Sequence, residues 1–491
     1  MKRFSYRIIA LLCFIATLGC EDYLDENPTN FISPEQFYNT AQDAQVAVFG
    51  LYAHLSNGDM YSRDLEMIGM HGDPAVSPNR VINLPQARYD YSPSFGDFSD
   101  IWNELYALIG DANKAIGRLN ASSLSQEDKD QFISEALFMR AYAYYTLQQF
   151  WGDVPLWTDE ITDNAEEIAS LSRTPVAQVR DQIVKDLLEA EDKLPSFYEG
   201  DFDKQRATRW AAKSLLAKTY LYQENWAAAE TVAMDVINNS PHELLPEYED
   251  VFRPDNEIND EIIFTVDFDE DIKFSTRGLR YGIRPVDEEP ATREPWMSGF
   301  GHYVVRQSFI DSYDPNDGRL EGIIFDENLA GEKLNFIYMA KFQRTEELDD
   351  ALGVNFILLR FADLLLVHAE AATENNNIAA AENSLNRVRN RAGLDAITGL
   401  SQSEMREAVR QERIWELVGE NHGKVDRMRW GTLVEDIREL PALSMAAGEK
   451  VGLVNMAEIQ AQNIEPKHLL LPIPEAEFQK NPNLGAQNPG W

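Results

Sequence analysis

Small and large apolar residues recur between residues 216 and 241 with the spacing of two packed α-helices. The residues that carry this pattern are Leu216, Ala217, Tyr220, Ala229, Ala233, Val236 and Pro241. Small side chains at a helix crossing let two backbones approach, and a proline after the second helix ends it. The pattern therefore predicts a helix pair, which must stack on other pairs because it cannot bury its apolar face alone.

This spacing is that of a tetratricopeptide repeat, and weaker copies occur elsewhere in the chain. One copy lies within 356–392 and is marked by Ala369, Ala381, Leu385 and Val388. A further pair opens with Ala141 and Tyr144, and its second helix, 175–193, is displaced by an insertion. We expect about four degenerate pairs in an all-α scaffold. Generic antiparallel helix packing is the alternative, and it predicts the same fold class.

Helical periodicity also marks three segments before the repeats, namely 34–55, 98–119 and 128–150. Two long segments lack it. Residues 56–95 are rich in Gly, Pro, Asn and Tyr, and residues 255–352 hold Gly, Pro, acidic and aromatic residues around one strand-like piece, 261–267. Connections this long are often functional, so we expect them to form an irregular binding face beside the helices.

The N-terminus resembles a signal peptide with a lipidation site. Three basic residues precede an apolar run from Ile8 to Leu18, which is too short to span a bilayer but suits a signal sequence. The run ends in Thr17-Leu18-Gly19-Cys20, similar to a lipobox, and the thiol of Cys20 can take a lipid. We therefore expect residues 1–19 to be removed; an ordinary secretory signal is the alternative.

Cysteine usage limits how the mature chain can be stabilised. Cys13 leaves with the signal peptide, so only Cys20 is left and neither a disulfide nor a Cys-based metal site can form. Stability must then come from a buried core.

Residues 20–34 contain Pro28 and Pro34 and are expected to be an extended leash. The helical regions 35–254 and 255–491 are expected to pack together as one body.

The net charge excludes several classes of partner. It is −38 for the whole chain; loss of Lys2, Arg3 and Arg7 leaves 41 basic against 82 acidic side chains, or −41. Such a surface repels polyanions, which disfavours nucleic acid and anionic lipid headgroups as partners. The most apolar later segment, 356–372, is interrupted by charged residues, so the lipid on Cys20 is the expected membrane attachment.

Several segments resemble the SusD/RagB-like outer-membrane lipoproteins of Bacteroidetes. They are Asp22-Tyr23-Leu24-Asp25 with Pro28-Thr29, then Glu135 to Tyr142 with Phe150 to Leu156, then Glu412 to Leu417, and finally Pro472 to Trp491. One departure is visible, because Lys424 and Val425 precede Asp426 where the family usually has an aromatic residue. The resemblance runs from Cys20 to Trp491.

The resemblance implies a cell-surface lipoprotein that binds oligosaccharides or polysaccharides and passes them to a SusC-like TonB-dependent transporter. Glu21-Asp22 after Cys20 resembles the family's surface-export signal. Capture of peptides, as in RagB-like members, is the nearest alternative. A protein-interaction scaffold without a small ligand is a second alternative, and a lipid-anchored glycosidase is a third.

A sugar ligand would need aromatic rings against the pyranose face and polar groups around its hydroxyl rim. The irregular segments supply both. The candidates are Tyr61, Asp73, Asn79, Arg80, Tyr89 and Tyr91 in the first segment and Tyr281, Trp296, Phe300 and Tyr303 in the second. The sharpest is Trp296, which stands in a stretch without helical period between Pro295 and Gly299.

No enzyme signature is apparent in the sequence. The seven histidines form no HExxH or tight ligand cluster, and no G-x-S-x-G or phosphate loop occurs. The stretch Asp314-Pro315-Asn316-Asp317-Gly318 is similar to a calcium loop, but its spacing differs and no Glu closes it, so we expect a turn. The chain is predicted to bind without catalytic residues, metal or cofactor.

Overall fold

The computed structural model describes residues 38–61, 64–78, 84–160, 170–200, 205–268, 303–327, 333–341 and 355–491. Its longer helices are α2 (Ala41–Ala53), α5 (Gly96–Ala121), α6 (Gln126–Trp151), α8 (Val176–Lys193), α9 (Arg209–Tyr222), α10 (Trp226–Asn239), α14 (Phe361–Glu374), α15 (Ile378–Arg391), α16 (Gln402–Glu416), α18 (Leu433–Ala446) and α19 (Val451–Asn463). Shorter helices are α3 (Asp64–His71), α4 (Pro85–Arg88), α12 (Gln307–Ile310), α13 (Leu320–Ile323), α17 (His422–Trp430) and α20 (Glu475–Lys480). The predicted signal peptide, Cys20 and the predicted leash lie outside the described residues.

Strands are few and short. They are β1 (Val76–Pro78), β2 (Val154–Pro155), β3 (Arg173–Thr174), β4 (Ile262–Val266), β5 (Tyr303–Val305), β6 (Ile324–Glu327), β7 (Lys333–Met339) and β8 (Phe356–Arg360). They form a four-stranded sheet in the order β1-β5-β7-β6 and two pairs, β2-β3 and β4-β8. The 3₁₀ turns are η3 (Tyr248–Phe252), η4 (Pro254–Asn256), η6 (Pro466–Leu469) and η7 (Pro482–Leu484).

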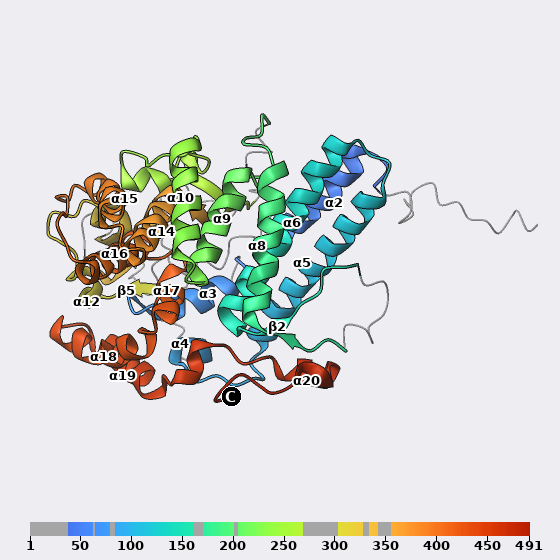
Figure 1. The fold of residues 1–491 in the computed structure, drawn as a ribbon. Helices are drawn as coiled ribbons and strands as arrows, with labels where there is room; N and C mark the ends of the chain where they lie inside the picture. The colour runs from blue at the N-terminus through green and yellow to red at the C-terminus, as the bar shows by residue number, and fades with distance from the viewer. Residues whose placement is uncertain are drawn as a thin grey trace, which may run out of the picture.

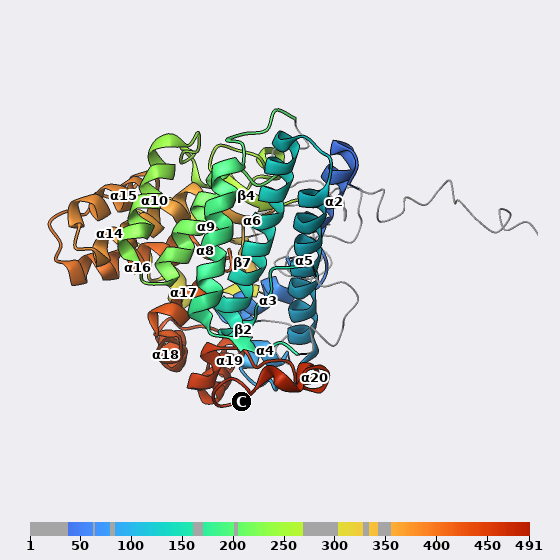
Figure 2. The same ribbon diagram turned by 45° about the vertical axis from the view of Figure 1, so that its right-hand side comes forward.

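The long helices stand side by side in a row (Figures 1 and 2). Helices α5, α6, α8, α9, α10, α14 and α15 follow one another, and each contacts the next. The predicted pairs are confirmed: α6 packs on α8, α9 on α10, and α14 on α15. In the pair α9 and α10, Ala217, Ala229 and Ala233 are fully buried at the crossing, as their spacing predicts. The all-α prediction is therefore confirmed.

Helix α6 illustrates why the sequence folds this way. The Ser125 hydroxyl accepts a hydrogen bond from the Asp128 amide at 3.1 Å and caps its start. Gly152 follows its last residue with a φ of 72°, a left-handed value that glycine adopts without strain. Because α5 and α8 cover it from both sides, apolar residues are buried all round the helix and not along one stripe.

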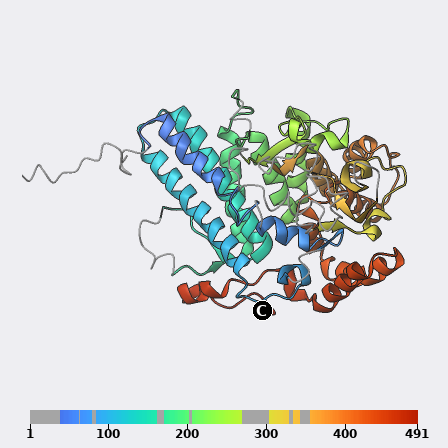
Figure 3. The same cartoon turned by 180° about the vertical axis from the view of Figure 1, so that it is seen from behind.

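The C-terminal part closes the molecule beside the row. Seen from behind, the blue helix α3 crosses this side and the red C-terminal helices run along the lower edge (Figure 3). Helix α17 packs on α3, and α19 packs on α4. The indole of Trp151, at the end of α6, donates to the Pro472 carbonyl at 3.0 Å, which ties the C-terminal tail to the helix row.

The predicted strand at 261–267 is confirmed as β4, whose antiparallel partner is β8. The helix expected to begin within 356–392 starts later than its apolar run, because residues Phe356 to Arg360 form that strand. All five are buried. A short, fully buried apolar run has neither a helical nor an alternating period, so the pattern alone cannot distinguish strand from helix. Within the described residues, no helix is both long and apolar enough to cross a bilayer.

Candidate ligand-binding site

A short antiparallel ladder joins the two irregular segments. Strand β1, from the first segment, pairs with β5, from the second, and the paired residues are Val76 with Val305, Ser77 with Val304, and Pro78 with Tyr303. The Arg306 amide extends the ladder by donating to the Ala75 carbonyl at 3.0 Å. Segments more than 200 residues apart in sequence are therefore joined at one place.

The ladder ends where several predicted site residues begin. Asn79 and Arg80 follow Pro78 directly in the sequence, and Phe300 precedes Tyr303 by three positions. These three residues, together with Tyr281 and Trp296, lie outside the described part of the chain. Their predicted ligand contacts therefore stay predictions.

Tyr61 is buried against the core. Its ring stacks on Phe356 with centroids 4.8 Å apart, and its hydroxyl is hydrogen-bonded to that of Tyr142. Burial raises the pKa of Tyr61 above its ordinary value, so the hydroxyl stays protonated. Packing against β8 accounts for the ring, which offers no open face for a ligand.

Tyr89, Tyr91 and Tyr303 are also buried. The Tyr89 hydroxyl donates to the Gly72 carbonyl at 3.2 Å. The Tyr91 ring stacks on Trp491 at 5.1 Å, which holds the end of the chain. Tyr303 is fully enclosed in the centre of the sheet. A ring buried in this way cannot stack on a sugar unless the core opens, so packing accounts for these three tyrosines.

Asp73 has a structural role as well. Its carboxylate lies 3.2 Å from the Arg427 guanidinium and accepts from the Ala75 amide at 3.0 Å. Burial raises its pKa, and Arg427 opposes that rise. At Gly423 a side chain would collide with this carboxylate, so glycine is required where α17 crosses α3. Asp73, two residues after the end of α3, thus joins this segment to α17.

A cavity of about 70 Å³ lies beside Tyr61. Its aromatic lining is Tyr61, Tyr142, Tyr145 and Tyr222, and its charged lining includes Lys218, Arg413 and Asp426. Among the described residues, the buried Tyr145 hydroxyl has no hydrogen-bond partner. A polar space of this size holds a few water molecules and is too small for a pyranose ring. We therefore interpret it as part of the core.

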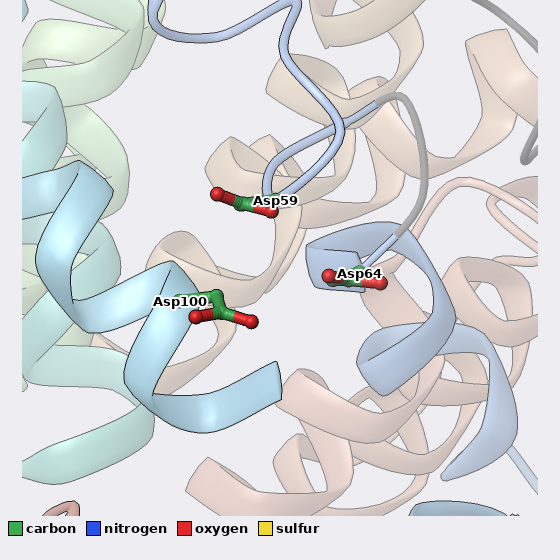
Figure 4. Close-up of side chains that lie close together, drawn as sticks. All are labelled: Asp59, Asp64 and Asp100. Atoms are coloured by element: carbon green, nitrogen blue, oxygen red, sulfur yellow. The ribbon is translucent and has the colours of Figure 1, made fainter. Parts of the chain in front are cut away.

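Three carboxylates meet near the start of α3 and α5. Asp59, Asp64 and Asp100 face one another, and one oxygen of each lies within 4.8 Å of the others (Figure 4). Carboxylate oxygens of this kind suit calcium or magnesium. Acidic groups also gather without an ion, and no other observation points to one here, so we assign no metal to this cluster.

At Asp314 the structure has the predicted turn, since its carboxylate accepts from the Asn316 amide at 2.8 Å.

The motif Glu412 to Leu417 supplies a buried ionic network. Glu416 lies 2.6 Å from Arg360 and 2.9 Å from Arg319, and it also pairs with Arg391. These side chains are all at most 3% exposed. Burial alone would raise the pKa of Glu416, but the three guanidiniums outweigh it and hold that pKa well below its usual range. The carboxylates in this motif therefore hold the fold together.

A second cavity, of about 230 Å³, opens beside α2. Its lining residues are Phe49, Tyr52, Ala53, Leu55, Ser56, Gln205, Arg206, Thr265, Val266 and Asp267. None of these residues was among the predicted ligand contacts. One signal was present: helix α2 has apolar residues on its outer face as well as its inner face, with Val46 57% exposed and Phe49 38% exposed. Gln205, Arg206 and residues 265–267 come from segments distant in sequence, so the fold alone brings them to α2.

Comparison with known proteins identifies relatives along the whole chain. Residues 326–491 match a family model described as "SusD family", and residues 22–221 match one described as "Starch-binding associating with outer membrane". SusD-like protein P25 from Formosa agariphila is 33% identical, and the match covers 97% of each chain. Neither family description names a catalytic activity.

Two solved structures share the fold. A SusD homolog from Bacteroides thetaiotaomicron has a TM-score of 0.82 at 23% identity, covering 93% of this chain and 98% of that one. Surface glycan-binding protein A from Bacteroides fluxus has a TM-score of 0.74 at 21% identity, covering 92% of this chain and all of that one. The fold expected from the resemblance is therefore confirmed.

Proposed function

The chain belongs to the SusD family, and from this premise we propose that it binds carbohydrates at the outer membrane without acting on them as an enzyme. The observation that carries the proposal is the β1–β5 ladder. It ties together the two segments that hold Asn79 and Arg80 on one side and Trp296 and Phe300 on the other. The family description and the glycan-binding name of a structural neighbour support the same class of ligand.

The proposed chemistry divides the work between rings and polar groups. Trp296 and Phe300 would stack on the apolar face of a pyranose ring, and Tyr281 would add a second aromatic surface. Asn79 and Arg80 would bond the hydroxyl groups around the rim, because amide and guanidinium groups donate in fixed directions. Such a site orients a sugar without a nucleophile or a general acid.

Glycan binding can be tested with the chain from Glu21 onwards, which contains every described residue. We expect affinity electrophoresis against a panel of polysaccharides to give retardation by at least one, and isothermal titration to give its affinity. Trp296→Ala should weaken that binding at least tenfold. The control is Trp226→Ala at the start of α10, which should leave it unchanged. Release of reducing sugar would contradict a purely binding role.

The proposal includes attachment through a lipid on Cys20, with the folded body facing the cell exterior. Its support is the lipobox-like sequence and the acidic pair Glu21-Asp22. In a bacterium with an outer membrane, Cys20→Ser should move the protein from the membrane fraction to the soluble fraction. The unaltered protein should be digested by protease added to intact cells; full protection would contradict the exterior location.

We also propose that a SusC-like TonB-dependent transporter receives the glycan. The test is copurification of a transporter with the tagged protein, followed by uptake of labelled oligosaccharide in cells that carry or lack this chain. Copurification without any glycan binding would favour the scaffold alternative. Binding of peptide mixtures without glycan binding would favour the peptide-capturing alternative.

A further inference from the structure

The open cavity beside α2 combines an exposed ring with buried polar supports. Phe49, which lines the cavity, is 38% exposed. Behind it, the guanidinium of Arg206 lies 5.3 Å from the centroid of this ring and 4.3 Å from that of Tyr198. Arg206 is itself held by an ion pair with the fully buried Glu135. Phe49 therefore has a fixed support and would not need to be ordered when a ligand arrives.

The rim of the cavity carries hydrogen-bonding groups of both kinds. The Gln205 amide donates to the Asp267 carboxylate at 3.0 Å, so the two side chains form one polar edge. The Ser56 hydroxyl, which donates to the Ala53 carbonyl at 3.1 Å, adds an acceptor on the α2 side. Tyr52, Val266 and Leu55 complete the wall between them.

We propose that this cavity is a second carbohydrate contact, which holds one pyranose unit of a bound oligosaccharide. The inference rests on the proposed function and extends it to residues that were not among the predicted ligand contacts. A pyranose has an apolar face for an aromatic ring and a rim of hydroxyl groups for carboxylate and amide partners. Phe49 supplies the first, and Gln205 with Asp267 supplies the second.

The size and charge of the cavity favour a single sugar ring over larger occupants. Its volume of about 230 Å³ lies below the roughly 300 Å³ at which pockets for drug-sized ligands begin. Arg206 is neutralised by its ion pair with Glu135, so it would not select an anionic ligand. The polar edge formed by Gln205 and Asp267 places hydrogen-bonding groups beside the ring, as the hydroxyl rim of a sugar requires.

The test uses the chain from Glu21 onwards and the polysaccharide that the unaltered protein binds. Phe49→Ala should weaken binding about three- to tenfold, because a stacked aromatic ring contributes on this scale. Phe49→Tyr keeps the ring and should stay within about twofold of the unaltered protein. Asp267→Asn should also weaken binding. The matched control is Phe197→Ala, which removes a phenyl ring that is 66% exposed and does not line the cavity.

The outcomes distinguish failure of the proposed function from failure of the second contact. If the unaltered protein binds no polysaccharide of the panel, the proposed function fails and this inference fails with it. If it binds one but Phe49→Ala and Asp267→Asn leave the affinity unchanged, only the second contact is overturned. Equal losses in Phe49→Ala and Phe197→Ala would indicate nonspecific adhesion and also overturn it. Phe49-dependent binding of peptides but not glycans would overturn the assignment to a sugar.

Discussion

At the scale of single residues, Glu416 shows how charge is used inside this protein. Its carboxylate pairs with Arg319, Arg360 and Arg391, and all four side chains are at most 3% exposed. Removal of one partner from such a network leaves buried charge uncompensated, and that costs more than the pair itself contributes. We expect Glu416→Gln to lower the free energy of unfolding by about 3 kcal/mol, measured by urea denaturation at pH 7.

The matched control for this prediction is on the same helix. Glu407 is exposed on α16, so Glu407→Gln should change the free energy of unfolding by no more than about 0.5 kcal/mol. Because the folded-state pKa of Glu416 is depressed, its contribution is present above the unfolded-state pKa of about 4.3 and is lost as the pH falls below it. Similar stability of the two variants would contradict the role of the network.

Lys424, where the sequence departs from the family pattern, is a buried ammonium without a carboxylate partner among the described residues. It is 2% exposed, its Nζ donates to the Ile68 carbonyl at 3.3 Å, and burial lowers its pKa to about 8. The charged form is therefore destabilised in the folded state. We expect Lys424→Met to raise the free energy of unfolding by about 1 to 3 kcal/mol at pH 7.

The pH dependence checks the cause of that effect. Between pH 8 and about 10.4, the usual lysine pKa, the unfolded chain binds more protons at Lys424 than the folded one, so stability should rise with pH. Lys424→Met should lack this rise, and the difference between variant and unaltered protein should shrink toward pH 10.4. Urea titrations at pH 7, 8.5 and 10 measure it; a constant difference would exclude burial of the charge as the cause.

At the scale of elements, sequence periodicity predicted the helices well and the strands poorly. The repeat at 216–241 became α9 and α10 because small residues permit one close crossing. The β1–β5 ladder joins three-residue pieces, too short for any period, and only the distant partner makes them strands. The sequence also did not predict the burial of Tyr89 and Tyr303, since a loop tyrosine that packs in the core cannot be distinguished in sequence from one that binds a ligand.

The C-terminal tail is an element held by side-chain bonds, and Asn488 is its main anchor. Its buried amide nitrogen donates to the carbonyls of Trp151, at 3.0 Å, and Leu471, at 2.7 Å. Asn488→Ala would leave both carbonyls without this donor, so we expect a loss of about 1 to 3 kcal/mol in the free energy of unfolding. Thermal and urea denaturation measure this loss. Asn390→Ala, at an exposed position on α15, should have little effect in both measurements.

Two results for Asn488→Ala would contradict its role as the anchor of the tail. If Asn488→Ala is as stable as the unaltered protein but limited proteolysis removes the tail, then the tail unfolds locally and does not stabilise the helix row. If stability and protease resistance are both unchanged, the two hydrogen bonds contribute nothing measurable.

For the whole molecule, the sequence predicted where a ligand-binding face would be sought but not which side chains would be available on it. Chain segments 56–95 and 255–352 do meet, at β1 and β5. The cavity at Phe49 and Asp267 was not predicted, because it depends on how α2 lies against residues 205–206 and β4. Distances of this kind come from packing, which a single sequence does not display.

The packing of the two predicted regions, 35–254 and 255–491, leads to a prediction for unfolding. Helix α10 contacts α14, and helix α9 contacts β4 and β8. The ammonium of Lys218, on α9, lies 2.5 Å from the carboxylate of Asp363, on α14, and both are buried. One hydrophobic cluster contains buried residues of both regions. We expect one cooperative urea transition, coincident by circular dichroism and by tryptophan fluorescence.

A substitution at the Lys218–Asp363 ion pair distinguishes one folding unit from two. Lys218→Ala leaves the carboxylate of Asp363 without this partner, so it should move the single transition to lower urea by about 3 kcal/mol in free energy without splitting it. Lys185→Ala, at an exposed position on α8, should leave the transition in place. If the regions folded independently, the two probes would separate, because tryptophans such as Trp151 and Trp430 lie in different regions while circular dichroism reports both. Coincident curves that shift together require that the helix row and its C-terminal cover unfold as one body.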